Sequence, residues 1–210
     1  MKSRFELLWE RVHRKYENGD PGHDLAHIRR VLAMCCRIGE KAGANLDVLL
    51  PAALLHDVVN VPKNHPDRTK ASRQAATVAV EFLREHDYTE EECGQIAQVI
   101  VEHSYSLGLK PSTLESAILQ DADRLDAIGA IGVMRTTTCG SRMGSKYYDM
   151  MDPFAKERAL DDKSFTLDHF FVKLFQLAEG MNTEEGKAEA KRRADFMRLF
   201  VEQLRAEITQ

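Results

Sequence analysis

The chain has 210 residues, 43% of them hydrophobic, which is enough for one well-packed core or a core with a small appendage. A net charge of −4 provides no broad basic field for a polyanionic duplex, so nucleic acid is not expected as the main partner. The four cysteines have no C-x-x-C spacing and the first residues are charged throughout. We therefore expect reduced thiols in a cytoplasmic protein, with neither export nor membrane insertion.

Apolar residues recur at helical spacing along almost the whole chain, and no stretch alternates as a half-buried strand would. This pattern predicts an all-α fold. A first helix should end near the turn formers Asn18 to Gly22, and a second should begin near His23 or Asp24. A third should reach His56, with Pro51 in its first turn, where the missing N–H costs little.

The segment from Val58 to Arg68 contains two prolines and no periodicity, so it is predicted to be a loop directly after His56-Asp57. Thr69 can open the next helix. Two further helices should begin at capping boxes, one formed by Thr89 with Glu92 and the other by Ser112 with Glu115.

The rest of the chain is expected to contain an irregular segment at 136–163 and two last helices, roughly 167–178 and 184–208. No repeat, low-complexity tract or linker divides the sequence. We therefore predict a single domain over residues 1–210, with a metal-binding core at about 20–130 and C-terminal helices at about 165–208.

The residues Ala52 to Leu55 are apolar for a full helical turn and lead directly into His56 and Asp57. A buried carboxylate needs a charged or hydrogen-bonding partner, and a divalent metal would satisfy both neighbours at once. His27 and Asp123, on other predicted helices, could converge on the same point. Such a mixed N/O donor set suits Mn²⁺, Fe²⁺, Co²⁺, Ni²⁺ or Zn²⁺ better than Ca²⁺.

The pattern His27, Leu54-Leu55-His56-Asp57 and Asp121-Ala122-Asp123-Arg124-Leu125-Asp126-Ala127-Ile128-Gly129 resembles the HD superfamily of phosphohydrolases. The match is closest to the small bacterial branch of YedJ-like and YpgQ-like proteins. The resemblance implies an HD-domain helical bundle in which His27, His56, Asp57 and Asp123 hold one metal ion. It also implies hydrolysis of phosphate ester or anhydride bonds in a nucleotide. The more specific activity that it suggests is that of a (d)NTP pyrophosphohydrolase.

Two departures from other HD branches narrow the prediction. We call His56 and Asp57 the dyad. Alarmone hydrolases carry an acidic pair shortly after it, whereas this chain has Val58, Val59, Asn60 and Val61 there. The extra histidine pair of cyclic-dinucleotide phosphodiesterases is missing too, since His103 stands alone between the dyad and Asp123. We therefore expect a mononuclear site, with Mn²⁺ favoured and Fe²⁺, Co²⁺, Ni²⁺, Zn²⁺ and Mg²⁺ left open.

Asp57 and His103 are the candidate catalytic residues, His103 as a donor of a proton or hydrogen bond to a substrate oxygen. Lys63 and Arg68 are the candidate substrate-binding residues, because loop cations can grip phosphate. The alternatives stay open: Lys63 and Arg68 could be solvated loop cations, and His103 a solvent-facing cap. His23 forms H-x-x-x-H with His27, but we expect it to start the helix or to support the ligands.

The expected partner is a small phosphorylated substrate, a nucleotide above all, and a homodimer is left open. The rival function is a non-catalytic nucleotide or metabolite sensor that retains the metal site, because a site does not by itself prove turnover.

Overall fold

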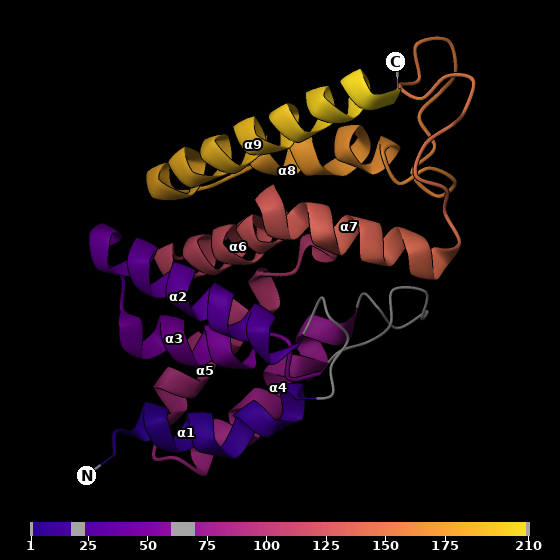
Figure 1. Ribbon diagram of the computed structural model, residues 1–210. Coiled ribbons are helices and arrows are strands. Elements are labelled where there is room, and N and C mark those ends of the chain that lie inside the picture. The colour runs from indigo at the N-terminus through magenta and orange to yellow at the C-terminus, as the bar shows by residue number, and fades with distance from the viewer. Residues whose placement is uncertain (1, 18–23, 60–69, 209–210) are drawn as a thin grey trace. The chain divides into compact units, whose positions relative to one another are not determined.

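The computed structural model describes residues 2–17, 24–59 and 70–208 (Figure 1). Within these ranges the protein is helical and contains no β-strand, only an isolated bridge between Lys146 and Phe165. The predicted all-α class is confirmed. The chain groups into two compact units, Met1–Asp123 and Arg124–Gln210, which we describe one at a time. The single-domain organisation stays a prediction.

The first unit is built around a short central helix. α3 is apolar nearly all round and buried along most of its length, as expected for a helix enclosed by others. It packs against α2 and α5, and α4 packs along α5. The elements of this unit are α1 (Arg4–Val12), the 3-10 turn η1 (His13–Tyr16), α2 (Leu25–Ala42), α3 (Leu46–Leu55), α4 (Ala71–Arg84), α5 (Glu90–Glu102) and the 3-10 turn η3 (Tyr105–Leu107). α6 (Leu114–Asp126) contains the boundary between the units.

Capping boxes were predicted at the starts of two helices, α5 and α6. The capping box of Thr89 and Glu92 is confirmed, with both reciprocal hydrogen bonds present at the start of α5. The second predicted box is wrong, because the amide and hydroxyl of Ser112 are bonded to the Glu102 carboxylate. Thr113 instead accepts from the amide of Ser116 at 3.1 Å, which moves the start of the helix by one residue.

Pro51 does not lie in a first helical turn, as the sequence had suggested, but inside α3. The reason is an earlier cap: the Asn45 side chain accepts from the Asp47 amide at 3.0 Å, so α3 already begins at Leu46. Thr69, predicted to open α4, and most of the predicted loop at 58–68 lie outside the described residues. α4 itself begins at Ala71 behind Lys70.

The second unit contains α7 (Gly129–Met143), the π-helical turn η4 (Phe170–Leu174), α8 (Phe175–Glu179) and α9 (Glu184–Ile208). The bounds of α9 agree with the prediction, and η4 with α8 covers most of the helix expected at 167–178. The irregular segment predicted at 136–163 is wrong over 136–143, which belongs to α7. Its glycines allow close packing and do not break the helix: a Cβ on Gly140 would lie 2.3 Å from Thr166 Oγ1, and one on Gly132 2.4 Å from Ala127 O.

The stretch between α7 and η4 is irregular but held by buried polar contacts. Asp168 is 1% exposed, and its two carboxylate oxygens accept from Arg158 at 2.5 and 2.8 Å. Arg158 also lies over the Phe165 ring, 4.5 Å from its centroid. Nearby, the Asp152 carboxylate accepts from the backbone amides of residues 156, 157 and 158. These contacts stabilise a conformation that the spacing of hydrophobic residues does not predict.

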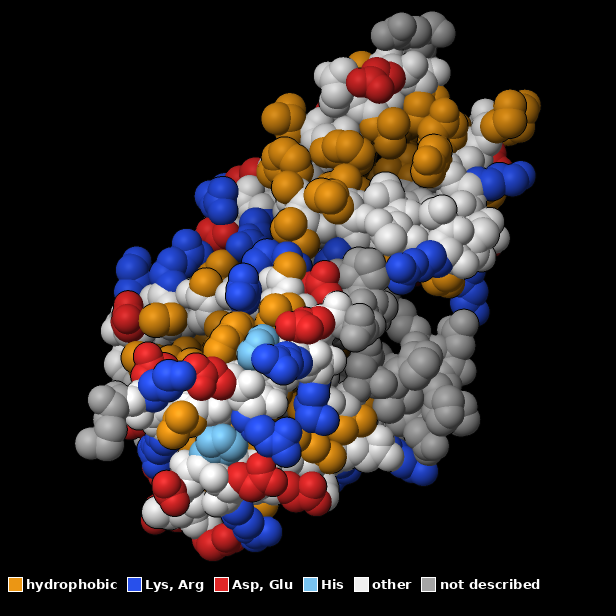
Figure 2. Space-filling model, turned by 60° about the horizontal axis from the view of Figure 1, so that its bottom comes forward, with side chains coloured by type: hydrophobic (Ala, Val, Ile, Leu, Met, Phe, Trp, Pro, Cys, Tyr) orange, Lys and Arg blue, Asp and Glu red, His pale blue; other side chains and the backbone are white. Residues whose placement is uncertain are grey.

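The surface mixes charged side chains of both signs with an apolar region at one end of the face drawn in Figure 2. The large hydrophobic residues that are most exposed belong to the second unit, namely Met134, Met143, Tyr147, Met150, Met151 and Leu199. No partner that would cover these side chains is identified, so the homodimer stays a prediction. None of the helices in the described residues has the length and hydropathy to cross a membrane.

Candidate metal centre

Four predicted ligands come from three helices of the first unit. His27 lies in the first turn of α2, where the N-cap Asp24 accepts from its amide at 2.8 Å. His56 is the C-cap of α3 and Asp57 follows it, while Asp123 lies near the end of α6. Both imidazoles are buried, whereas the side chains of Asp57 and Asp123 are 19% and 30% exposed. The site is therefore open to solvent on its carboxylate side.

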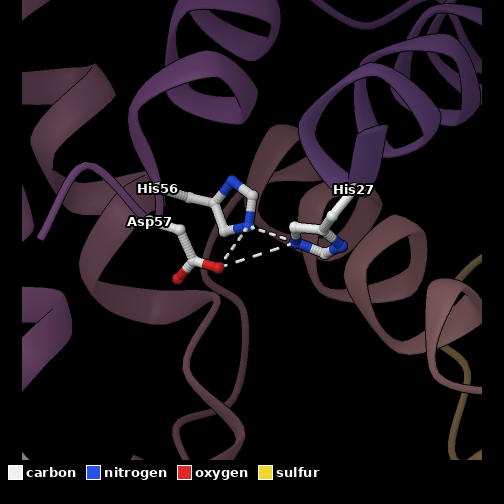
Figure 3. Close-up of side chains that lie close together, drawn as sticks. All are labelled: His27, His56 and Asp57. Carbon is white, nitrogen blue, oxygen red and sulfur yellow. Dashed lines mark hydrogen bonds and ion pairs between the residues drawn. The ribbon is translucent and has the colours of Figure 1, made fainter. Parts of the chain in front are cut away.

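The structure brings the histidines and Asp57 together with their polar atoms facing one another (Figure 3). The Nε2 atoms of His27 and His56 are 3.3 Å apart. Asp57 Oδ2 lies 3.6 Å from His27 Nε2 and 3.5 Å from His56 Nε2. Asp123 approaches from α6, with Oδ1 3.7 Å from His27 Nε2.

The protonation of His56 follows from its second ring nitrogen. Nδ1 lies 2.8 Å from the carbonyl oxygen of Ala53, which can only accept, so Nδ1 carries the proton. Nε2, the other ring nitrogen, faces the carboxylate of Asp57, which is an acceptor. Two acceptors at this distance repel each other unless a proton or a cation lies between them. A backbone carbonyl that orients a histidine in this way is the usual support of a metal ligand.

The spacing of His27 Nε2, His56 Nε2 and Asp57 Oδ2 also fits one coordination sphere. Nitrogen and oxygen ligands lie about 2.1 Å from a first-row divalent ion, so neighbouring ligands in a tetrahedral site are about 3.4 Å apart. The separations of 3.3 to 3.6 Å among these three atoms fall close to this value. Asp123 lies 3.7 Å from His27 Nε2 but outside the cluster in which every ligand atom is within 4.8 Å of the others. His27, His56 and Asp57 therefore fit a divalent cation, and Asp123 as the fourth ligand stays a prediction.

His103 contacts the dyad from the end of α5. Its ring meets the His56 ring edge-on, with centroids 4.9 Å apart and an interplanar angle of 83°. Its Nδ1 donates to the carbonyl of Ile100. Burial lowers the pKa of His103, and the neighbouring His56 lowers it further, so the neutral ring is favoured. Gln120 fixes this end of α5 by donating to Glu102 O at 2.7 Å.

Sequence reasoning missed one residue that lies next to the dyad. The hydroxyl of Tyr16, in η1, donates to the carbonyl of Leu54 at 2.6 Å. No local pattern could have revealed this contact, because it joins residues far apart in the chain. Lys63 and Arg68, predicted to bind substrate, and His23, the alternative histidine, lie outside the described residues.

The fold and the site together define a helical bundle in which two histidines and a carboxylate are clustered as candidate metal ligands. The HD domain family model matches residues 24–128, a range that contains all four predicted ligands. The chain belongs to the HD domain family.

Several relatives match nearly the whole chain. Bacillus subtilis YpgQ is 32% identical over 191 residues, covering 89% of this chain and 85% of YpgQ. The crystal structure of YpgQ in complex with ADP has a TM-score of 0.74 at 29% identity, and the match covers 97% of this chain and 94% of that one. An HD-superfamily hydrolase from Bacillus thuringiensis has a TM-score of 0.76 at 32% identity, covering 97% and 96%.

Proposed function

We propose that the protein is a metal-dependent phosphohydrolase that cleaves a phosphate ester or anhydride bond of a nucleotide. The observation that carries the proposal is the convergence of His27 Nε2, His56 Nε2 and Asp57 Oδ2 at one point. Membership of the HD family and the ADP complex of the similar YpgQ support a nucleotide ligand. More specifically, we propose that the reaction releases pyrophosphate from a (d)NTP.

In this proposal His27, His56, Asp57 and Asp123 hold one divalent cation, with Mn²⁺ favoured. When bound, the cation supplies positive charge that lowers the pKa of a water molecule and offsets charge on a phosphate oxygen. Catalysis is then mainly positional and electrostatic. In this proposal the substrate enters on the side of the site where the carboxylates of Asp57 and Asp123 are partly exposed. Lys63 and Arg68 remain the proposed phosphate contacts.

His103 takes a narrower role in the proposal than the sequence suggested. Because its Nδ1 proton is engaged by Ile100 O, the neutral ring has only an acceptor left at Nε2. We propose that Nε2 of His103 accepts a hydrogen bond from the attacking water and so orients it, since the neutral ring has no proton at Nε2 to donate to the substrate.

The variant His103→Phe tests this role because it keeps a ring against His56 and removes the acceptor. Its kcat should fall by about 10²-fold or more, with metal affinity and KM close to wild type. Tyr105→Phe, on the exposed neighbouring turn, is the control and should keep wild-type kinetics. A kcat unchanged in His103→Phe would exclude this role of His103 in orienting the water.

The function itself is tested by incubating the Mn²⁺-loaded protein with a panel of nucleoside mono-, di- and triphosphates and identifying the products. We expect turnover of at least one nucleotide, loss of turnover after chelation, and its return when Mn²⁺ is restored. Tight binding of nucleotides by the metal-loaded protein without any product would refute the phosphohydrolase proposal and establish the non-catalytic sensor.

A further inference from the structure

The end of α3 carries two of the proposed metal ligands, His56 and Asp57. The last four carbonyls of a helix have no partner within the helix. α2 and α7 close their ends with glycines in the left-handed conformation, Gly43 and Gly144. At the end of α3 the C-cap is His56 itself, in the right-handed region at φ −58° and ψ −33°. A left-handed residue there would turn the following Asp57 away, so other donors must satisfy the carbonyls.

Three donors close the end of α3. The Nδ1 proton of His56 is donated to Ala53 O at 2.8 Å, and the amide of Val58 is donated to Leu55 O at 3.1 Å. Between them, Leu54 O accepts from the Tyr16 hydroxyl at 2.6 Å. Two of these donors are local to the dyad. Tyr16 is the one that anchors the end of α3 to another element, η1.

We propose that Tyr16 is a positioning residue that holds the end of α3 so that His56 and Asp57 both face His27. This inference rests on the metal site proposed above. The Tyr16 side chain is buried at 3% exposure, so its hydroxyl has little access to water as an alternative partner. Burial and the nearby negative charge of Asp57 raise the pKa of Tyr16, which keeps the hydroxyl a donor at neutral pH.

A second buried tyrosine provides a matched control. Tyr88 is 5% exposed, and its ring packs under the Arg4 guanidinium, 4.2 Å from the centroid. Burial, with a contribution from the charge of Asp47 in the first turn of α3, raises the pKa of Tyr88 to about 12. Tyr88 is thus near the opposite end of the same helix. Removing its hydroxyl perturbs the same core without touching the dyad.

The test compares Tyr16→Phe and Tyr88→Phe by titration with Co²⁺, following both affinity and the visible absorption of the bound ion. Loss of a supporting contact behind metal ligands typically weakens binding about 10- to 100-fold. We expect a loss of that size and an altered Co²⁺ spectrum for Tyr16→Phe, with wild-type behaviour for Tyr88→Phe. Wild-type affinity and spectrum in a folded Tyr16→Phe would overturn the proposal, as would equal losses in both variants.

The outcomes separate this inference from the proposed function. If wild type itself binds no Co²⁺, the metal site fails, and the positioning role falls with it. If wild type binds the ion and Tyr16→Phe binds it equally well, only the positioning role fails. Should Tyr16→Phe not fold, ¹⁹F spectra of wild type carrying 3-fluorotyrosine at position 16 or 88 give a second reading. Metal should shift the resonance at 16 but not that at 88, and an unmoved resonance at 16 would overturn the inference.

Discussion

Asp57→Asn is expected to lose both metal binding and turnover. The substitution keeps the size of the side chain but removes the negative charge that faces two imidazole nitrogens at 3.5 and 3.6 Å. Metal affinity should fall by more than about 100-fold, because even residues that only support ligands account for 10- to 100-fold. Turnover should fall by about 10³-fold or more, since the bound ion contributes several kcal/mol to the transition state.

The same variant should not be less stable without metal. Asp57 Oδ2 lies 3.5 Å from His56 Nε2, a nitrogen to which an asparagine amide could donate. Urea unfolding with a chelator should therefore give an unfolding free energy equal to or above that of wild type. Asp47→Asn, in the first turn of the same helix, is the control and should retain the metal. Normal metal content and turnover in Asp57→Asn would refute the proposed site.

Arg158→Leu is expected to cause the largest loss of stability among the contacts of the second unit described above. The substitution leaves the carboxylate of Asp168 buried without its bidentate cation, although the Asp161 amide still donates to it at 2.7 Å. Breaking a buried ion pair from one side costs about 3 to 5 kcal/mol. The irregular stretch between α7 and η4 should also become sensitive to protease, because Arg158 additionally donates to the Asp152 carbonyl within it.

Arg84→Leu is the matched control for that experiment. Arg84 also makes a bidentate pair, with Glu90 at 2.7 Å, but both side chains are largely exposed. Exposed pairs contribute little to stability, so this variant should unfold close to wild type. Adding Asp168→Asn to Arg158→Leu should recover part of the loss, because it removes the unpaired charge. Equal urea midpoints for Arg158→Leu and wild type would contradict the role of the buried pair.

The sequence predicted the helices that depend on local signals. The capping box at Thr89 and the helix at 184–208 follow from patterns within a few residues, and both are confirmed. The prediction failed where tertiary contacts decide. The Ser112 hydroxyl bonds to the Glu102 carboxylate and not to the start of its own helix. Gly140 lies inside α7, where the close approach of Thr166 leaves no space for a side chain. Neither contact leaves a trace in the local sequence.

In the candidate site, too, the features set by local sequence were predicted and those set by tertiary contacts were not. An imidazole next to a carboxylate at the end of an apolar helix indicated the dyad, and the family pattern indicated His27 and Asp123. The role of Tyr16 at Leu54 O could not be predicted, because it depends on the packing of η1 beside the end of α3. The narrower role of His103 likewise depends on its bond to Ile100 O, which sets which nitrogen carries the proton.

The most direct test of the metal site is a crystal of the protein grown with Mn²⁺, measured for anomalous scattering from that ion. The account predicts one strong anomalous peak among the four ligand atoms, about 2.0 to 2.2 Å from His27 Nε2, His56 Nε2 and a carboxylate oxygen of each of Asp57 and Asp123. An anomalous map with no peak between the two imidazoles, or with the ion bound elsewhere on the protein, would contradict it.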